Sequence, residues 1–223
     1  MSLSFILHTD GSVFINGQRL DPKSWHTAPA AQGAKAGGRD VSAQEALAAL
    51  SRTVPLRHLV VGVIGPREAS VAESSAAEAV GAALGALGLT VICGGRSGVM
   101  EAVSKGVSAA GGLAIGILPG STPDEANRFV GIALPTGLGE ARNMIIAKSA
   151  RVLIAVGGSY GTLTEVAYGL HFGKAVIGLE GAPDVEGVQR ANSVDAAIAL
   201  ALAALAAVAV AAGRTDPCES SAT

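Results

Sequence analysis

The sequence predicts an α/β protein built on a doubly wound parallel sheet with helices on both faces. Apolar runs such as HLVVGVIG (58–65) and RVLIAVGG (151–158) are continuous rather than alternating, as in strands that are covered on both sides. They alternate with helical segments along the chain, which is the pattern of parallel strands joined by crossover helices. Aromatic residues make up only 3% and glycine contributes 30 residues, so we expect a core of small aliphatic side chains on closely approaching backbones.

Residues 1–27 are expected to form a small N-terminal β-hairpin in front of the main domain. The runs SFILHT and SVFING flank Asp10-Gly11, a dipeptide typical of a tight hairpin turn. Residues 28–56 are expected to be a linker with a short helix as an option, because APAAQGAKAGGRD (28–40) is small, polar and without period. The main domain is then expected over residues 57–213, followed by a disordered tail over 214–223.

The main domain is expected to be Rossmann-like, with strands and helices that alternate along most of the chain. In chain order we expect strand 58–65, helix 71–87, strand 89–93, helix 99–110, strand 113–120, strand 132–137, helix 140–150, strand 151–158, helix 162–172, strand 175–179 and a final helix 193–213. The final helix contains an uncharged stretch, 196–212. It is mostly alanine and falls short of the roughly 20 strongly apolar residues of a membrane span, so we expect it to pack on the sheet.

Charge and composition exclude several classes of function. The formal net charge is −2 and no cluster of lysine or arginine is present, so we do not expect a nucleic-acid polymer as partner. Cys93 and Cys218 are too few for a disulfide framework or a thiolate zinc site. The start MSLSFILHTDG lacks the basic and apolar regions of a secretion signal. We therefore expect a cytoplasmic protein that binds no metal and no membrane.

Glycine-rich loops follow four of the expected strands, at the sheet edge where ligands of open parallel sheets bind. Glycine lets the backbone approach an oxygen-rich ligand, and amides at a helix start favour a phosphate. A single such loop is equally well explained as a tight turn, but four on one edge favour binding. Neither GxxxxGK[ST] nor GxGxxG after the first strand is present, which disfavours a P-loop or a standard dinucleotide site. The candidate ligand-binding residues are Gly65, Arg67, Gly94, Gly95, Arg96, Ser97, Gly98, Pro119, Gly157, Gly158, Ser159, Tyr160, Gly161 and Thr162.

Two charged residues stand at expected helix starts beside these loops, Arg142 in GLGEARNM and Glu165 in GTLTE. An acidic residue near a helix start is common because the helix dipole favours it. A cation there is unfavourable unless something compensates it, and an anionic ligand or Glu165 itself would do so. We therefore regard Arg142 and Glu165 as candidate site residues, and the family resemblance below implies their catalytic roles. Arg67 and Arg96 could pair with a phosphate through their planar forks, or could simply be solvated.

At these residues the chain resembles the LOG family, also called lysine-decarboxylase-like. Its members hydrolyse cytokinin nucleotides at the N-glycosidic bond, and molybdenum cofactor carrier proteins are related to them. The signature PGGxGTxxE corresponds to residues 157–165, with Gly157 at the proline position and Ser159 at the second glycine. The family's Arg-Lys pair corresponds to Arg142 and Asn143. The resemblance spans residues 59–182, and GGRSGVMEAVSKG, AIGILPG and TGLGEARN look closer to the carrier branch.

The resemblance implies two functions. A carrier would hold a phosphorylated pterin, the molybdenum cofactor, without converting it. An N-glycosidase acting on a purine nucleoside monophosphate would use Glu165 to stabilise an oxocarbenium-like ribose or to activate water, and Arg142 to hold the phosphate or the glutamate. Asn143 at the family's lysine position favours the carrier.

The resemblance also implies a homodimer or a homotetramer. Decarboxylation is suggested only by the family's older name, since no lysine stands in a context typical of a pyridoxal phosphate site.

Overall fold

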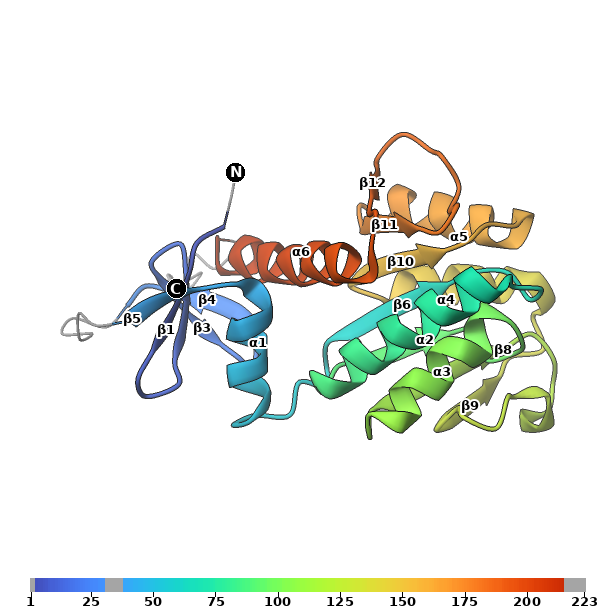
Figure 1. Cartoon of the computed structure of the whole chain (residues 1–223), viewed down its shortest axis with the longest axis horizontal. Coiled ribbons are helices and arrows are strands. Elements are labelled where there is room, and N and C mark those ends of the chain that lie inside the picture. The colour runs from blue at the N-terminus through green and yellow to red at the C-terminus, as the bar shows by residue number, and fades with distance from the viewer. Residues whose placement is uncertain (1–2, 31–37, 215–223) are drawn as a thin grey trace, which may run out of the picture. The chain divides into compact units, whose positions relative to one another are not determined.

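The computed structural model describes residues 3–30 and 38–214, which belong to two compact units (Figure 1). One unit comprises the chain up to Leu56 together with the chain from Leu202 onward, and the other spans Arg57–Ala201. Part of the expected linker, residues 31–37, and the expected tail from residue 215 onward lie outside the described residues.

The first unit contains an antiparallel five-stranded sheet of order β4-β3-β2-β1-β5. Its strands are β1 (Phe5–His8), β2 (Val13–Ile15), β3 (Gln18–Asp21), β4 (His26–Ala28) and β5 (Gly38–Val41). The predicted hairpin is confirmed as β1 and β2, and three further strands extend it. Helix α1 (Ala43–Ser51) follows, with a capping box between Ser42 and Glu45.

The prediction of a flexible linker was wrong for residues 38–40. These residues belong to β5, which pairs antiparallel with β1 from Phe5 opposite Val41 to His8 opposite Gly38. The strand is mostly exposed and shows no apolar alternation. The free backbone groups at the edge of β1 can accept a strand whatever its side chains, so periodicity gave no sign of it.

Helix α6 (Val194–Arg214) was expected to pack on the main sheet alone, but the division between the units falls within it, after Ala201. In its second half Leu202, Leu205, Ala206 and Ala209 are buried, and the buried indole of Trp25 donates a hydrogen bond to the Leu205 carbonyl at 2.8 Å. Segment Val194–Gly213 is, by length and composition alone, apolar enough to cross a membrane, contrary to the sequence expectation. The contact with Trp25 gives part of that apolar surface a partner within the protein.

The second unit contains the predicted parallel sheet, with seven strands in the order β12-β11-β10-β6-β7-β8-β9. Its strands are β6 (Val60–Ile64), β7 (Thr90–Cys93), β8 (Leu113–Leu118), β9 (Ile132–Pro135), β10 (Val152–Val156), β11 (Ala175–Leu179) and β12 (Val188–Arg190). Its other helices are α2 (Val71–Ala86), α3 (Val99–Ala109), α4 (Asn143–Ser149) and α5 (Tyr160–His171), with 3₁₀ turns η1 (Pro123–Glu125) and η2 (Gly139–Arg142). The predicted helix 140–150 is thus a 3₁₀ turn followed by a shorter α-helix.

Helices cover both faces of this sheet, as predicted. Helices α2 and α3 pack closely against each other, while α4 and α5 contribute Ile146, Ala147 and Val166 to one buried cluster (Figure 1). Alternate residues of one strand, such as Leu153 and Ala155, point to the same face and join this cluster. The strand order runs outward from β6 in one direction and from β10 in the other. The point of reversal between these two strands is where ligands of such sheets bind.

Candidate ligand-binding site

A pocket of about 640 Å³ lies in the second unit, at the reversal between β6 and β10. This volume is in the range of pockets that hold small molecules and cofactors. The loop after β6, the start of the loop after β7, turn η2 with the first residue of α4, and the loop after β10 with the start of α5 contribute to its wall. The lining residues are Ile64, Gly65, Pro66, Arg67, Glu68, Gly94, Met100, Glu140, Arg142, Asn143, Gly158, Ser159, Tyr160, Gly161, Thr162, Thr164 and Glu165.

Arg142 and Glu165 both line this pocket and form a buried ion pair. Atom Nη1 of Arg142 lies 3.8 Å from Oε1 of Glu165, and the side chains are only 4% and 8% exposed. At that distance the two groups attract each other without forming a hydrogen bond. The Nε and Nη1 atoms of Arg142 are buried and have no hydrogen-bond partner. The pocket therefore contains a buried guanidinium with two donor atoms, Nε and Nη1, that have no hydrogen-bond partner in the protein.

Gly94 provides the space that the guanidinium occupies. A Cβ atom at this position would lie 2.6 Å from both Nη1 and Nη2 of Arg142, closer than nonbonded atoms can approach. Any larger residue would have to displace Arg142 or move the loop after β7. This glycine is needed for the approach of a side chain, whereas the sequence had suggested an approach by a ligand.

Burial and charge together shift the titration of the pair. Burial raises the pKa of Glu165 to about 8, and the negative charge of Glu140 adds to this, while Arg142 opposes it. Burial also lowers the pKa of Arg142, and the two carboxylates oppose that change. Glu165 is therefore mostly protonated at neutral pH, and can donate a hydrogen bond as well as accept one.

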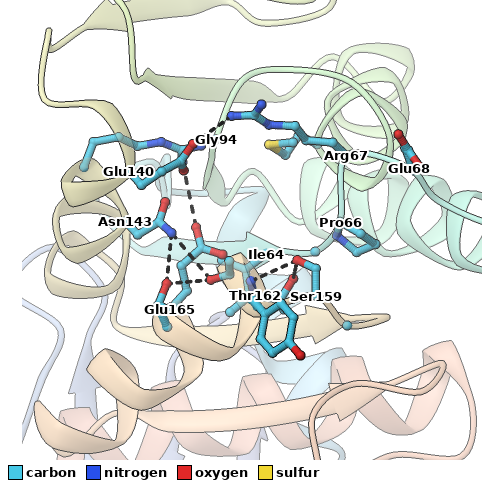
Figure 2. A pocket seen from close by; sticks show the side chains of 17 residues that line it. Ile64, Pro66, Arg67, Glu68, Gly94, Glu140, Asn143, Ser159, Thr162 and Glu165 are labelled. Atoms are coloured by element: carbon cyan, nitrogen blue, oxygen red, sulfur yellow. Dashed lines mark hydrogen bonds and ion pairs between the residues drawn. The ribbon is translucent and has the colours of Figure 1, made fainter.

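Asn143 ties α4 to the start of α5. Its Nδ2 donates to Thr164 Oγ1 at 3.0 Å, and Thr164 Oγ1 donates in turn to the Gly161 carbonyl at 2.7 Å (Figure 2). Asn143 is buried and directly follows Arg142 in the chain. The residue at the family's lysine position thus holds the floor of the pocket in place instead of adding a second cation.

The N-termini of α2 and α5 are capped by their own residues. Ser70 accepts a hydrogen bond from the Glu73 amide, and Ser159 accepts one from the Thr162 amide. Those two amides are therefore already bonded, which limits the phosphate binding that the sequence suggested at these helix starts. Helix α3, by contrast, begins after Gly98, which has positive φ and makes no side-chain cap.

The pocket brings together some of the predicted site residues and leaves others outside. Those in its wall are Arg142, Glu165, Gly65, Arg67, Gly94, Gly158, Ser159, Tyr160, Gly161 and Thr162. Those outside it are Gly95, Arg96, Ser97, Gly98, Pro119 and Gly157. The residues outside hold the loops together: Ser97 Oγ donates to the Arg67 carbonyl, and the Gly95 and Arg96 carbonyls both accept from Asn127 Nδ2.

Glu140 lines the pocket but was not among the candidate residues, although it contacts one of them, Arg67. It shares the run GLGEARNM with Arg142, but a glutamate at the start of a helical segment is unremarkable by itself. In the structure its Oε1 accepts a hydrogen bond from Arg67 Nη2 at 3.1 Å, between η2 and the loop after β6 (Figure 2). Pro66, Glu68 and Met100 belong to the glycine-rich loops expected at the site but were not among the candidate residues. Ile64, Asn143 and Thr164 were not expected in the wall.

The parallel sheet, the pocket at its reversal and the buried Arg–Glu pair define a Rossmann-like domain with a site of small-molecule size. The profile of the SLOG cluster4 family matches residues 58–208, more than half of the chain. The chain therefore belongs to the SLOG cluster4 family. This confirms the resemblance to the LOG family that the sequence motifs indicated.

Solved structures of molybdenum cofactor proteins are similar to this chain. The molybdenum cofactor binding protein of Rippkaea orientalis is 37% identical with a TM-score of 0.62, over 65% of this chain and 96% of that one. The molybdenum cofactor carrier protein of Chlamydomonas reinhardtii is 38% identical with a TM-score of 0.62, over 67% and 99%. An uncharacterized protein of Archaeoglobus fulgidus is 40% identical over 134 residues, 60% of this chain and 88% of that one. The expectation that this chain stands near the carrier branch is confirmed.

Proposed function

We propose that this protein binds a phosphorylated, nucleotide-like small molecule in the pocket, and that it acts as a carrier of the molybdenum cofactor. The observation that carries the proposal is that two donor atoms of the Arg142 guanidinium have no hydrogen-bond partner. Its Nε and Nη1 atoms are buried, in a wall to which glycine, serine and threonine contribute seven of the seventeen residues. Buried polar groups nearly always have a partner, so an anion from outside the protein is the natural one.

The residues present fit a phosphorylated pterin as cargo. Arg142 would meet the phosphate, and the glycines on both sides of the pocket leave its backbone open to close contact. Among the described residues, no group of three or more His, Cys, Asp or Glu could hold a metal ion. Two solved relatives at 37% and 38% identity are named for binding or carrying this cofactor, which supports the choice.

The alternative is hydrolysis of the N-glycosidic bond of a purine nucleoside monophosphate, the reaction of a phosphoribohydrolase. The proximity of Arg142 and Glu165 favours it, because both residues stand at the spacing of the enzymes. The raised pKa of Glu165 argues against it, because a mostly protonated carboxyl group neither stabilises a cationic ribose nor activates water. Asn143 at the lysine position also argues against hydrolysis, because its side chain makes a structural hydrogen bond to Thr164. The carrier is therefore the better-supported function.

Retention of the cofactor by purified protein tests the proposal. The protein is mixed with molybdenum cofactor without oxygen, free cofactor is removed on a desalting column, and bound pterin and molybdenum are measured. We expect both to stay with the protein in a fixed ratio, and a mass increase of one cofactor per subunit in native mass spectrometry. The carrier proposal fails if the wild-type protein retains neither. Free base released from a panel of nucleoside monophosphates would instead support the hydrolase.

We also infer that the protein works as a homodimer or a homotetramer in the cytoplasm. Helices α4 and α5 pack together and carry Met144, Leu163 and Tyr168, whose side chains are more than a third exposed. Exposed apolar residues gathered on neighbouring helices are typical of subunit interfaces. The interface would lie close to the pocket, because Thr164 and Glu165 belong to the same helix as Leu163.

A further inference from the structure

The pocket contains an ion pair that an anion-binding site does not obviously need. Arg67 and Glu140 both line the pocket, and they reach toward each other from the loop after β6 and from η2 (Figure 2). Their atoms Nη2 and Oε1 are 3.1 Å apart. The carboxylate of Glu140 thus occupies one of the two arginines that an anionic ligand could use.

The ion pair between Arg67 and Glu140 affects the net charge of the pocket wall. The lining contains two positive charges, on Arg67 and Arg142, and two negative charges, on Glu68 and Glu140. Glu165 is mostly protonated at neutral pH and adds little charge. The pocket as it stands is therefore close to neutral. The charge of Glu140 also opposes the lowering of the pKa of Arg142 and raises the pKa of Glu165, so this carboxylate acts on the inner pair as well.

The ion pair between Arg67 and Glu140 is exposed and can separate at little cost in free energy. The side chain of Arg67 is 44% exposed and that of Glu140 is 72% exposed, so water screens their attraction and both can move without disturbing the core. A phosphate offers a guanidinium two parallel charge-assisted hydrogen bonds, whereas Glu140 uses a single oxygen at hydrogen-bond distance. A phosphate that enters the pocket can therefore displace Glu140 from Arg67.

We propose that Glu140 is an internal competitor for the anionic group of the ligand: its carboxylate holds Arg67 in the free protein and gives it up to the ligand. This inference rests on the proposed function, because it assigns a specificity device to the same site. Glu140 acts through Arg67 and is a positioning residue, whereas Arg67 becomes a direct contact of the ligand. A multiply charged phosphate monoester would be selected over ligands that are neutral or carry one diffuse charge, because they cannot displace the carboxylate.

The test is a double-mutant cycle on cofactor affinity. Wild type, Glu140→Gln, Arg67→Ala and the double variant are titrated with molybdenum cofactor at pH 7, and the concentration for half-saturation is measured. We expect Glu140→Gln to bind roughly twofold to fivefold more tightly, the range that corresponds to the loss of one exposed ion pair. Arg67→Ala should bind more weakly than wild type, and adding Glu140→Gln to it should tighten binding less than Glu140→Gln does in the wild type. Glu140→Asp, which keeps the carboxylate, should stay nearer to wild type than Glu140→Gln does.

The matched control is Glu78→Gln. Glu78 forms a similar exposed ion pair with Lys105 at 2.9 Å, outside the pocket, so its loss should leave affinity unchanged. The inference is overturned if Glu140→Gln behaves like this control, or if it tightens binding equally with and without Arg67. In either case binding by the wild type, weakened in Arg142→Ala, would leave the proposed function standing. Absence of cofactor binding by the wild type would overturn both.

Discussion

The guanidinium of Arg142 lies 3.8 Å from the carboxyl group of Glu165, with both side chains buried and no hydrogen bond between them. A buried ion pair of good geometry would use the donors of its arginine, and this one does not. When Glu165 is ionised, its attraction offsets part of the cost of burying the Arg142 charge, while Nε and Nη1 of Arg142 stay without a hydrogen-bond partner. Most expectations about the site depend on this relationship.

Replacement of Arg142 by alanine should weaken binding of the phosphorylated ligand about tenfold or more, because a charge-assisted contact of roughly 1.5–3 kcal/mol is lost. Arg142→Lys should restore only part of the affinity, since an ammonium group lacks the planar fork. Calorimetric titration with the cofactor measures both. Lys105→Ala, which removes an exposed cation outside the pocket, is the control. Equal affinity of wild type and Arg142→Ala would make Arg142 a bystander.

Replacement of Glu165 by glutamine should leave the fold intact and alter the dependence of stability on pH. The pKa of Glu165 in the folded protein, about 8, exceeds the ordinary value of 4.5, so the folded state holds the proton more tightly. The stability from this residue is therefore complete below about pH 4.5 and decreases as the pH rises to about 8. Glutamine stays neutral, so the midpoint of thermal unfolding should fall less between pH 5 and pH 9 in the variant. A large drop in that midpoint at pH 5 would make Glu165 a structural residue.

Ligand affinity should pass through a maximum with pH. It should rise as the phosphate of the ligand loses its second proton at about pH 6. It should fall above about pH 8, where Glu165 ionises and its negative charge repels the bound anion. In Glu165→Gln the fall above pH 8 should disappear while the rise remains. A similar fall in both proteins would mean that another group controls the alkaline side.

The protein should have the mass of a dimer or a tetramer in light scattering at micromolar concentration. Met144 and Tyr168 lie on the exposed surface of α4 and α5, so Met144→Asp and Tyr168→Asp should reduce the mass toward that of the monomer. Asp184→Asn, at a highly exposed side chain outside these helices, should not. A monomeric wild type would contradict this prediction.

The second half of α6 should be required for the packing of Trp25. This residue is the single tryptophan of the chain, it is fully buried, and its indole donates to the Leu205 carbonyl. Removal of the chain after Ala201 should therefore shift its fluorescence to longer wavelength, because the indole becomes exposed to water. A truncated protein with the emission of the full chain would show that Trp25 is held by the N-terminal sheet without α6.

The sequence alone determined the parallel sheet of the second unit and most of its helices and strands, but not the short edge strand β12. Continuous apolar runs identify strands that are buried on both faces, and glycines after the strands mark the sheet edge where a ligand can approach. The stretch 157–165 and Arg142 indicated the family, because these residue types recur at a fixed spacing. These features are local: each depends on the backbone preferences and burial of one short segment.

The tertiary structure decided which side chains meet. Arg67 and Glu140 are 73 residues apart, and only the arrangement of the loop after β6 and η2 brings them into contact. The burial of Arg142 against Gly94 and the use of Asn143 to hold α5 likewise depend on packing between elements. The same holds for β5, which was invisible to periodicity because its edge pairing needs only backbone groups. Sequence patterns specify elements and the faces they bury, whereas the partners of a charge follow from how those elements pack together.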